Sequence, residues 1–232
     1  MPQPGQGVSL RMNAIQEELS DLYRSRFQAS GLEKRRAVWR TLNDAFFSRL
    51  ISPEDEVLEL ACGYGEFIST IRARRKFGVD LNPDTAARLP PGVEFRNASA
   101  DDLSFMTTAG VDVVFTSNFL EHLPDKPALS RVLAEAYRVL RPGGRFIILG
   151  PNVRYAYREY WDFYDHHLPL SDRSLSEGLM AAGFAIERAI PQFLPFTMAG
   201  KTPAHPLLIR AYLALPLAWK ILGKQFLIVA RR

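Results

Sequence analysis

A glycine-rich turn between a predicted strand and a predicted helix, within residues 57–67, is the part of the chain best suited to bind a ligand. An apolar run containing Glu59 leads into Gly63 and Gly65. The two glycines allow a sharp turn and a close approach of the backbone to a ligand, because neither has a Cβ. The unpaired N–H groups at the start of the helix predicted over 66–73 face the same place. This arrangement predicts a site for a nucleotide-like ligand.

A second acid follows at the distance expected of a ribose-binding carboxylate. Asp80 ends the short apolar segment 77–80, and doubly wound folds place such a carboxylate about 20 residues beyond the turn. A dinucleotide site would have a third glycine at the position of Ile68. Glu59 would also repel a pyrophosphate, so a cationic ligand fits the turn better.

These residues resemble the first motif of the class I S-adenosylmethionine-dependent methyltransferases, which is an acid followed by x-G-x-G-x-G. The segment from Glu59 to Gly65 matches it except at Ala61, where the family has its first glycine. The resemblance implies that S-adenosyl-L-methionine is the cofactor and that the carboxylate after the second strand holds its ribose. The residues implied to contact it are Glu59, Ala61, Cys62, Gly63, Gly65, Asp80 and Leu81.

A second motif of that family is similar to the segment 97–105, which would contact the adenine. Ser99 stands where the family usually has an acid. The adenine amino group would therefore meet the Ser99 hydroxyl, the backbone near Ala100 or the Asp101 carboxylate, and these alternatives stay open.

Two further segments match the family in the expected order. Residues 111–122 are similar to its fourth strand and following loop, which implies that Asn118 lies on the cofactor side. Residues 138–148 are similar to its helix, turn and fifth strand.

The segment 151–170, after the predicted fifth strand, is dense in aromatic and ionisable residues. Loops at the carboxyl ends of parallel strands line the ligand crevice. We therefore expect an acceptor pocket lined by Tyr155, Tyr160, Trp161 and Tyr164. The alternative is that these aromatic side chains only pack the loop onto the domain.

A base is needed only if the methyl acceptor must lose a proton early, as a hydroxyl does. The candidates are His166 and His167, with Asp165, in the aromatic loop, and His122 after the fourth strand. A histidine pKa of about 6.5 suits this role, although a structural or cofactor-side role is the alternative for His122. Adjacent histidines point in different directions and make a poor metal site, so no metal is expected.

Strands are expected near 56–61, 76–80, 93–97, 111–117, 144–150, 184–190 and 224–231. Helices between most of them predict an α/β fold, Rossmann-like, with a seven-stranded, mainly parallel sheet covered on both faces. The family resemblance implies that the last strand is antiparallel. Two helices predicted over 13–49 would make residues 1–50 an N-terminal helical cap, over the sheet edge or over the cofactor, and 51–232 the methyltransferase domain.

The segment 191–223 is longer than the hairpin that usually joins the last two strands in this family. Its predicted helix over 203–222 is rich in leucine, carries Trp219 and should kink or break at Pro216. From residue 191 to the end, the chain has six basic residues and no acidic one. This pattern is typical of an interfacial element on anionic lipid, and the alternatives are a lid or a helix packed on its own domain.

Composition limits the class of protein. The chain has 232 residues, 47% of them hydrophobic, which is enough for one core. Its lone cysteine excludes an internal disulfide and fits a reducing compartment. No apolar leader and no apolar run of about 20 residues is visible. The expected location is cytoplasmic, with peripheral contact at the inner face of the cell membrane as a further expectation.

The main interpretation is methyl transfer to a small-molecule, glycan or lipid-linked glycan acceptor, at oxygen. Residues 152–174 and 223–226 are similar to bacterial methyltransferases associated with surface polysaccharide synthesis. The alternatives are a non-catalytic S-adenosylmethionine-binding protein, an RNA methyltransferase, and a nicotinamide-dependent reductase that the glycine spacing disfavours. No nucleic-acid partner is expected, because the net charge of +4 is accompanied by no RNA-binding signature.

Overall fold

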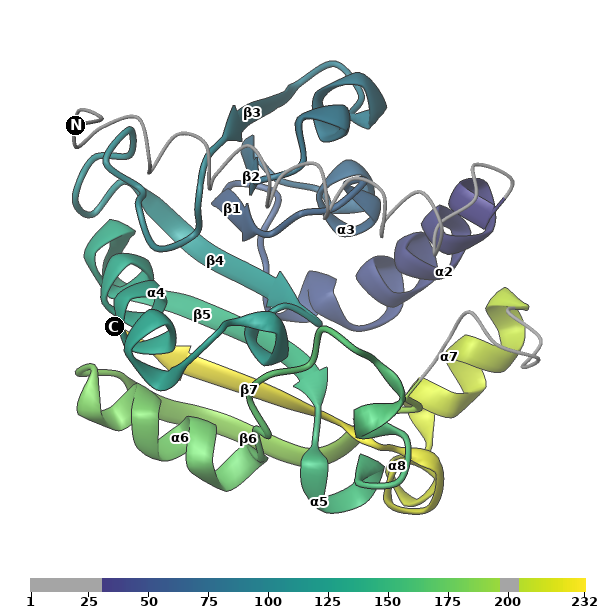
Figure 1. Cartoon of the computed structure of the whole chain (residues 1–232). Coiled ribbons are helices and arrows are strands. Elements are labelled where there is room, and N and C mark those ends of the chain that lie inside the picture. The colour runs from purple at the N-terminus through teal and green to yellow at the C-terminus, as the bar shows by residue number, and fades with distance from the viewer. Residues whose placement is uncertain (1–30, 197–204) are drawn as a thin grey trace.

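The computed structural model describes residues 31–196 and 205–232. Seven strands form one sheet in the order β3-β2-β1-β4-β5-β7-β6 (Figure 1). Their bounds are β1 Glu56–Leu60, β2 Arg75–Asp80, β3 Val93–Asn97, β4 Val111–Ser117, β5 Leu140–Pro151, β6 Ala185–Leu194 and β7 Gln225–Arg231. All pairings from β3 to β5 are parallel, and β7 is antiparallel to both of its neighbours. The predicted Rossmann-like fold is confirmed.

Helices cover both faces of this sheet (Figure 1). The α-helices are α2 Leu32–Ala45, α3 Glu66–Thr70, α4 Lys126–Val139, α5 Val153–Ala156, α6 Asp172–Ala181, α7 Pro206–Ala214 and α8 Pro216–Leu222. Short 3-10 segments occur at Phe47–Arg49, Pro83–Arg88, Leu120–His122 and Tyr160–Asp162. Side chains of α4 and α6 enter one core cluster, and those of α2, α3 and α7 enter the other.

The central strand β5 shows how the two cores are divided. Phe146 and Ile148 belong to the α4 and α6 side, whereas Ile147 and Leu149 belong to the α2 and α7 side. Successive side chains of a strand point to opposite faces, and a strand covered on both faces is therefore apolar throughout. This explains why the segment reads as one continuous hydrophobic run.

Several boundaries differ from the prediction. The helix after the glycine turn ends at Thr70 rather than 73, since Arg74 N donates to Asp55 O and directs the chain into β2. The β5 strand begins at Leu140, across a register shift in its pairing with β4. The β6 strand runs to Leu194, so the connection before β7 is shorter than predicted.

The helix predicted over 203–222 is broken at Pro216 into α7 and α8, as expected. Of the two helices predicted over 13–49, α2 is confirmed, and most of the other lies outside the described residues. The division into a cap over 1–50 and a domain over 51–232 stays a prediction.

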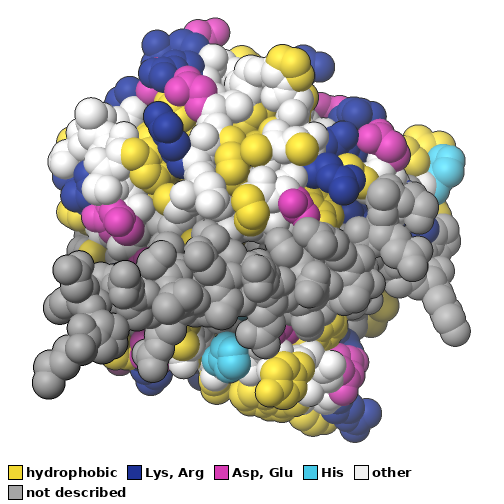
Figure 2. Space-filling model, turned by 45° about the horizontal axis from the view of Figure 1, so that its top comes forward, with side chains coloured by type: hydrophobic (Ala, Val, Ile, Leu, Met, Phe, Trp, Pro, Cys, Tyr) yellow, Lys and Arg dark blue, Asp and Glu magenta, His cyan; other side chains and the backbone are white. Residues whose placement is uncertain are grey.

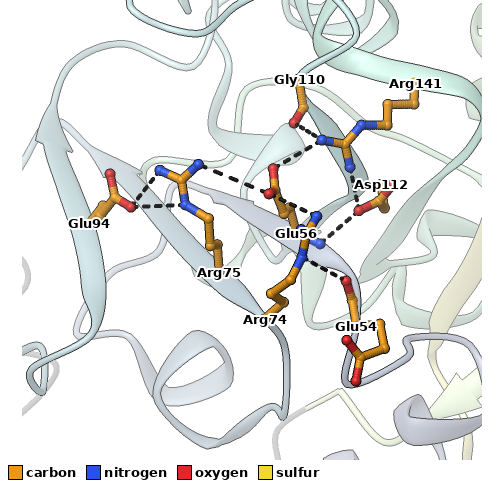
Figure 3. A network of polar contacts seen from close by, with 8 residues as sticks. All are labelled: Glu54, Glu56, Arg74, Arg75, Glu94, Gly110, Asp112 and Arg141. Atoms are coloured by element: carbon orange, nitrogen blue, oxygen red, sulfur yellow. Dashed lines mark hydrogen bonds and ion pairs between the residues drawn. The ribbon is translucent and has the colours of Figure 1, made fainter.

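Charged side chains of both signs are interspersed over the face seen in Figure 2. At the amino ends of the strands they form a network (Figure 3). The buried Glu56 carboxylate pairs with Arg74 at 2.9 Å and Arg141 at 3.1 Å, and Arg141 also pairs with Asp112. Glu56 N donates to the Asp112 carboxylate at 2.8 Å. The network therefore joins β1, β4 and β5 at the edge opposite the glycine turn.

Candidate cofactor and acceptor site

The glycine turn lies at the carboxyl end of β1 and depends on left-handed backbone conformations. The φ angles are 50° at Ala61, 54° at Gly63 and 71° at Gly65. A Cβ on Gly65 would lie 2.1 Å from Leu89 Cδ2, so a side chain there would force Leu89 to move and would also have to adopt a left-handed φ. Ala61 adopts the same region with a Cβ, which carries a steric cost that glycine avoids.

Asp80, at the carboxyl end of β2, is placed beside this turn as predicted. Its Oδ2 accepts a hydrogen bond from Gly63 N at 2.7 Å, and its Oδ1 accepts one from Asn82 N at 2.8 Å. Burial raises the pKa of Asp80 to about 6, against the opposing effect of these two hydrogen bonds. Leu81 follows it and is half-buried.

Glu59 is buried beneath the same turn. Its Oε2 accepts a hydrogen bond from Ile68 N, at 3.0 Å, in the first turns of α3. Burial raises the pKa of Glu59 well above its usual range, and the nearby Glu66 and Asp80 raise it further. Three acids thus converge on one small region.

The electrostatic field of this region fits a cationic ligand. The buried Cys62 thiol has a pKa well above its usual range, because of burial and then because of the Glu59 and Asp80 charges. Its Sγ would lie 3.0 Å from a Cβ on Gly78, which shows that Cys62 is packed against β2. The sulfonium and ammonium groups of S-adenosylmethionine match this negative field, so the residues fit that cofactor.

The segment predicted to contact adenine lies next to Asp80, because Ala98 N donates to Asp80 O. The Ser99 hydroxyl donates to Asp101, and Arg131 of α4 donates to the same carboxylate at 3.0 Å. Although burial raises it, the net pKa of Asp101 lies below its usual value because of these hydrogen bonds. Ala100 is buried. The Ser99 hydroxyl and the Asp101 carboxylate are therefore already hydrogen-bonded to each other. Of the three alternatives for contact with the adenine amino group, the backbone near Ala100 competes least with these hydrogen bonds.

Asn118 follows β4 with a φ of 49°, and its side chain is exposed. Asn118 N donates to Leu149 O at 2.9 Å, and Thr116 Oγ1 donates to Leu60 O at 3.1 Å. These contacts hold the carboxyl ends of β1, β4 and β5 together. The predicted cofactor residues thus gather at one edge of the sheet.

The aromatic loop after β5 lies against the 3-10 turn Leu120–His122. His167 N and Leu168 N both donate to Glu121 O, at 2.8 and 3.0 Å. The His166 ring is buried, stacks on Phe163 at 4.9 Å and meets the His122 ring edge to face at 4.9 Å. Two predicted candidates, His122 and His166, are thus brought together from different segments.

His122 is oriented by Asp165. Its Nδ1 lies 3.1 Å from Asp165 Oδ2 and 3.0 Å from Asp165 O. Because both partners can only accept, the proton belongs on Nδ1, and Nε2 is left as the acceptor. Although burial lowers it, the pKa of His122 lies above its usual value because of Asp165 and Glu121. The side chain is 28% exposed, so a ligand can reach it.

Glu121 completes this cluster. Its carboxylate is buried, and burial raises its pKa to about 6. One oxygen lies 4.0 Å from His122 Nε2. The possible ligand atoms of Glu121, His122 and His166 all lie within 4.8 Å of one another, so this trio is also a group that could hold a metal ion. Only His166 and His167 were considered as a metal pair from the sequence, whereas the structure groups His166 with Glu121 and His122.

The predicted acceptor-lining side chains divide into three groups. Tyr160 is fully buried, and its hydroxyl donates to Leu168 O and accepts from Leu170 N, so it holds the loop together. Trp161 and Tyr164 are exposed, and Tyr155 is half-buried. The packing alternative is right for Tyr160. His167 is exposed, and its contact with Glu121 is made by its backbone.

A pocket of about 400 Å³ lies between this loop and the last two strands. It is lined by Glu159, Asp162, Phe163, Pro195, Phe196, Leu222 and Lys224. Phe163 connects the pocket to the cluster, because its ring stacks on His166 and also contacts Phe196. The pocket and the part played by Glu121 were not predicted, and Asp165 was predicted as a candidate base rather than as the partner that orients His122. The available signal was two acid–histidine pairs in sequence, Glu121-His122 and Asp165-His166.

Residues 58–148 match a family described as a methyltransferase domain. A probable S-adenosylmethionine-dependent methyltransferase of Mycolicibacterium smegmatis is 34% identical over 60% of this chain and 55% of that protein. A ubiquinone biosynthesis O-methyltransferase of Xanthomonas oryzae pv. oryzae is 33% identical over 45% of this chain and 46% of that protein. The chain spans about half the length of these relatives. A solved methyltransferase structure from Archaeoglobus fulgidus has the same fold, with 20% identity, a TM-score of 0.65 and coverage of 91% and 98%.

Residues 58–148 therefore match a methyltransferase domain, and they lie in the fold of a solved S-adenosylmethionine-dependent methyltransferase. The similarity to S-adenosylmethionine-dependent methyltransferases implies S-adenosyl-L-methionine as the cofactor. The turn after β1, with Asp80 after β2, has the geometry and charge that would hold it. The His122 cluster lies at the same sheet edge, after β4 and β5, where a methyl acceptor would approach.

Proposed function

We propose that this methyltransferase transfers a methyl group to a hydroxyl oxygen of a small-molecule, glycan or lipid-linked glycan acceptor. The observation that carries the proposal is the His122–Asp165 pair at the sheet edge that also holds the cofactor turn. A hydroxyl must lose its proton for methyl transfer, and a neutral histidine is suited to take it. An O-methyltransferase among the similar proteins supports oxygen as the acceptor atom.

The cofactor supplies an electrophilic sulfonium methyl group when it is bound. Asp80 would hold the ribose hydroxyls with the oxygen lone pairs that Gly63 N and Asn82 N leave available. A cationic centre bound beside Glu59 would oppose the effect of burial on its pKa and favour the ionised carboxylate, which would then attract that cation. The left-handed turn lets the backbone lie close to the ligand, since a larger residue at Gly65 would collide with Leu89.

The His122 side chain provides the acid–base function in this proposal. The acceptor O–H bond breaks as its proton moves to Nε2. The oxygen would bond to the methyl carbon as the bond from that carbon to sulfur breaks, with the electron pair of the broken bond left on sulfur. Asp165 keeps the other ring proton on Nδ1 and stabilises the imidazolium that results. Water takes the proton from Nε2 at the end of the cycle. His166, fixed by stacking on Phe163, limits the positions of the His122 ring.

Cytoplasmic location is part of the same proposal, supported by the single buried cysteine. No helix in the described ranges is long and apolar enough to cross a bilayer.

The direct test is a product assay. Purified protein and S-adenosylmethionine are incubated with hydroxylated acceptors and with matched amine analogues, and S-adenosylhomocysteine and methylated product are measured by mass spectrometry. We expect O-methylated product only. Methylation of the amines alone would overturn the oxygen assignment, and tight cofactor binding without turnover on any acceptor would favour the non-catalytic alternative.

The same assay tests the metal alternative. The proton-transfer role needs no ion, so dialysis against EDTA should leave the rate unchanged. Loss of activity that Zn²⁺ or Mn²⁺ restores would instead assign Glu121, His122 and His166 as metal ligands.

A further inference from the structure

The exposed apolar surface of the molecule is concentrated on two short helices. Six of the eleven exposed large hydrophobic side chains of the described residues lie on α7, on α8 or between them, with exposed fractions from 54% to 79%. They are Leu207, Leu208, Leu215, Leu217, Ile221 and Leu222. The α8 helix has no buried residue. We call this set the α7–α8 surface. Such a concentration usually marks an interaction site.

The other side of these helices is firmly attached to the domain. Ile209 and Leu213 are buried in the core cluster that contains α2. The Tyr212 hydroxyl donates to Phe193 O at 2.7 Å, and Trp219 Nε1 donates to Tyr212 O at 2.8 Å. The Trp219 ring also packs edge to face on Phe193. The exposed side chains are therefore presented by anchored helices.

The charge of the α7–α8 surface indicates the chemical nature of its binding partner. Arg210 and Lys220 are exposed on the two helices, and residues 205–223 contain no acid. An isologous contact with a second copy would bring these basic residues near their own copies, which is unfavourable. Apolar side chains flanked by basic ones instead match the interface of an anionic bilayer. We propose that the α7–α8 surface docks the protein onto an anionic lipid bilayer.

Docking through the α7–α8 surface would also place the acceptor pocket near the membrane. Leu222 of the α7–α8 surface lines the pocket beside the aromatic loop. Phe163, on the same pocket, stacks on His166, whose ring contacts His122. Lys224 N donates to Leu194 O, and Asn152 N donates to Lys224 O, which places the end of α8 at the carboxyl edge of β5. A lipid-linked hydroxyl would thus reach the base from the membrane side. This second step rests on the proposed function.

Flotation with vesicles tests the docking directly. The full chain is mixed with phosphatidylcholine vesicles that contain or lack phosphatidylglycerol, at low and at high salt. We expect flotation only with phosphatidylglycerol, weakened by salt. The double variant Leu217→Glu, Ile221→Glu should stay at the bottom, and Lys220→Glu should bind at least about fivefold more weakly. Met180→Glu on α6, another exposed apolar position, is the matched control and should float like the wild type.

Folding is checked by circular dichroism and by S-adenosylmethionine affinity, which should be unchanged in every variant. The proposal is overturned if the wild type never floats at low salt, or if the double variant floats as well as Met180→Glu. It is also overturned if the double variant converts a dimer into a monomer in sedimentation without any flotation of the wild type. Turnover of a soluble acceptor without vesicles tests the proposed function separately, so the two failures are distinguishable.

Discussion

Asp80 holds the glycine turn, and we expect it to bind the cofactor ribose as well, a role that its pKa of about 6 would make pH-dependent. A ribose hydroxyl donates to the ionised carboxylate. Affinity for S-adenosylmethionine should therefore rise with pH through about 6 and then level off. The folding stability of the cofactor-free protein depends on pH with the opposite sign. Because the pKa of Asp80 is raised in the folded state, its contribution to stability is present in full below pH 3.8 and is lost as pH rises through about 6.

Calorimetry of cofactor binding between pH 5 and pH 8 measures the first effect. Asp80→Asn should bind more weakly at neutral pH, by about 1.5–3 kcal/mol for each charge-assisted hydrogen bond lost, and should lose the pH dependence. A wild-type affinity that is flat across this range would contradict the assignment of Asp80.

Ala61 occupies a conformation that suits glycine. Relief of left-handed strain, about 1–2 kcal/mol, is partly offset by the greater unfolded-state freedom of glycine, about 0.4–1 kcal/mol. Ala61→Gly should therefore keep or slightly raise the thermal midpoint and keep cofactor affinity, whereas Ala61→Val should lower both. Ala109, with a φ of 54° away from the turn, is the matched control for the stability change. A clear loss of stability in Ala61→Gly would contradict this explanation.

His122 and His167 offer a matched pair of substitutions. His122→Ala should slow turnover by about 10²–10⁴-fold without changing cofactor affinity, because a general base contributes that much. His167→Ala should have little effect, since its contact with Glu121 uses the backbone. Turnover should rise with pH through the raised pKa of His122. In Asp165→Asn that inflection should move to lower pH, a shift that a purely structural role for Asp165 would not produce.

At the scale of elements, the amino ends of the strands carry a stabilising ion-pair network, whereas their carboxyl ends carry the candidate site. Glu56 supports the amino ends of β1, β4 and β5 (Figure 3). Glu56→Gln should lower the free energy of unfolding by about 1–3 kcal/mol, because a buried acceptor of two arginines is weakened. Arg75→Gln removes the more exposed pair with Glu94 and a 4.0 Å contact with Glu56, and its effect on the free energy of unfolding should be much smaller because solvent screens this side chain. Urea unfolding measures both, and cofactor affinity should stay unchanged.

Features that depend on residues close together in sequence were predicted better than features that depend on contacts between distant segments. The glycine turn with Asp80 beside it, and the seven strands of a mainly parallel sheet, depend on short motifs and on apolar runs, and they were predicted correctly. The pairing of Asp101 with Arg131 and the burial of Tyr160 depend on partners that only the folded chain supplies. The acid–histidine cluster was missed for the same reason, since its members come from the ends of β4 and β5. His166 and His167 are adjacent in sequence, but the first is buried and the second is exposed.

At the scale of the whole molecule, the antiparallel strand β7 determines how the parts of the site combine. Its first residue, Gln225, pairs with Pro151 of β5 and with Leu194 of β6. The connection that enters β7 therefore meets the loop that leaves β5, and Lys224 pairs with Glu159 across the pocket. A fully parallel sheet would place these two segments at opposite edges. The inserted strand thus brings the α7–α8 surface close to the acceptor side.

This arrangement predicts that membrane docking and turnover are linked. In anionic vesicles, a hydroxylated acceptor with a lipid tail should be methylated faster than the same acceptor without a tail, because docking raises its local concentration at the pocket. Leu217→Glu, Ile221→Glu should remove that advantage and leave the rate on the tail-less acceptor unchanged, since neither residue lines the pocket. Met180→Glu should retain it. Equal rates on both acceptors in wild-type protein that does float would separate docking from acceptor choice, and the surface would then serve location alone.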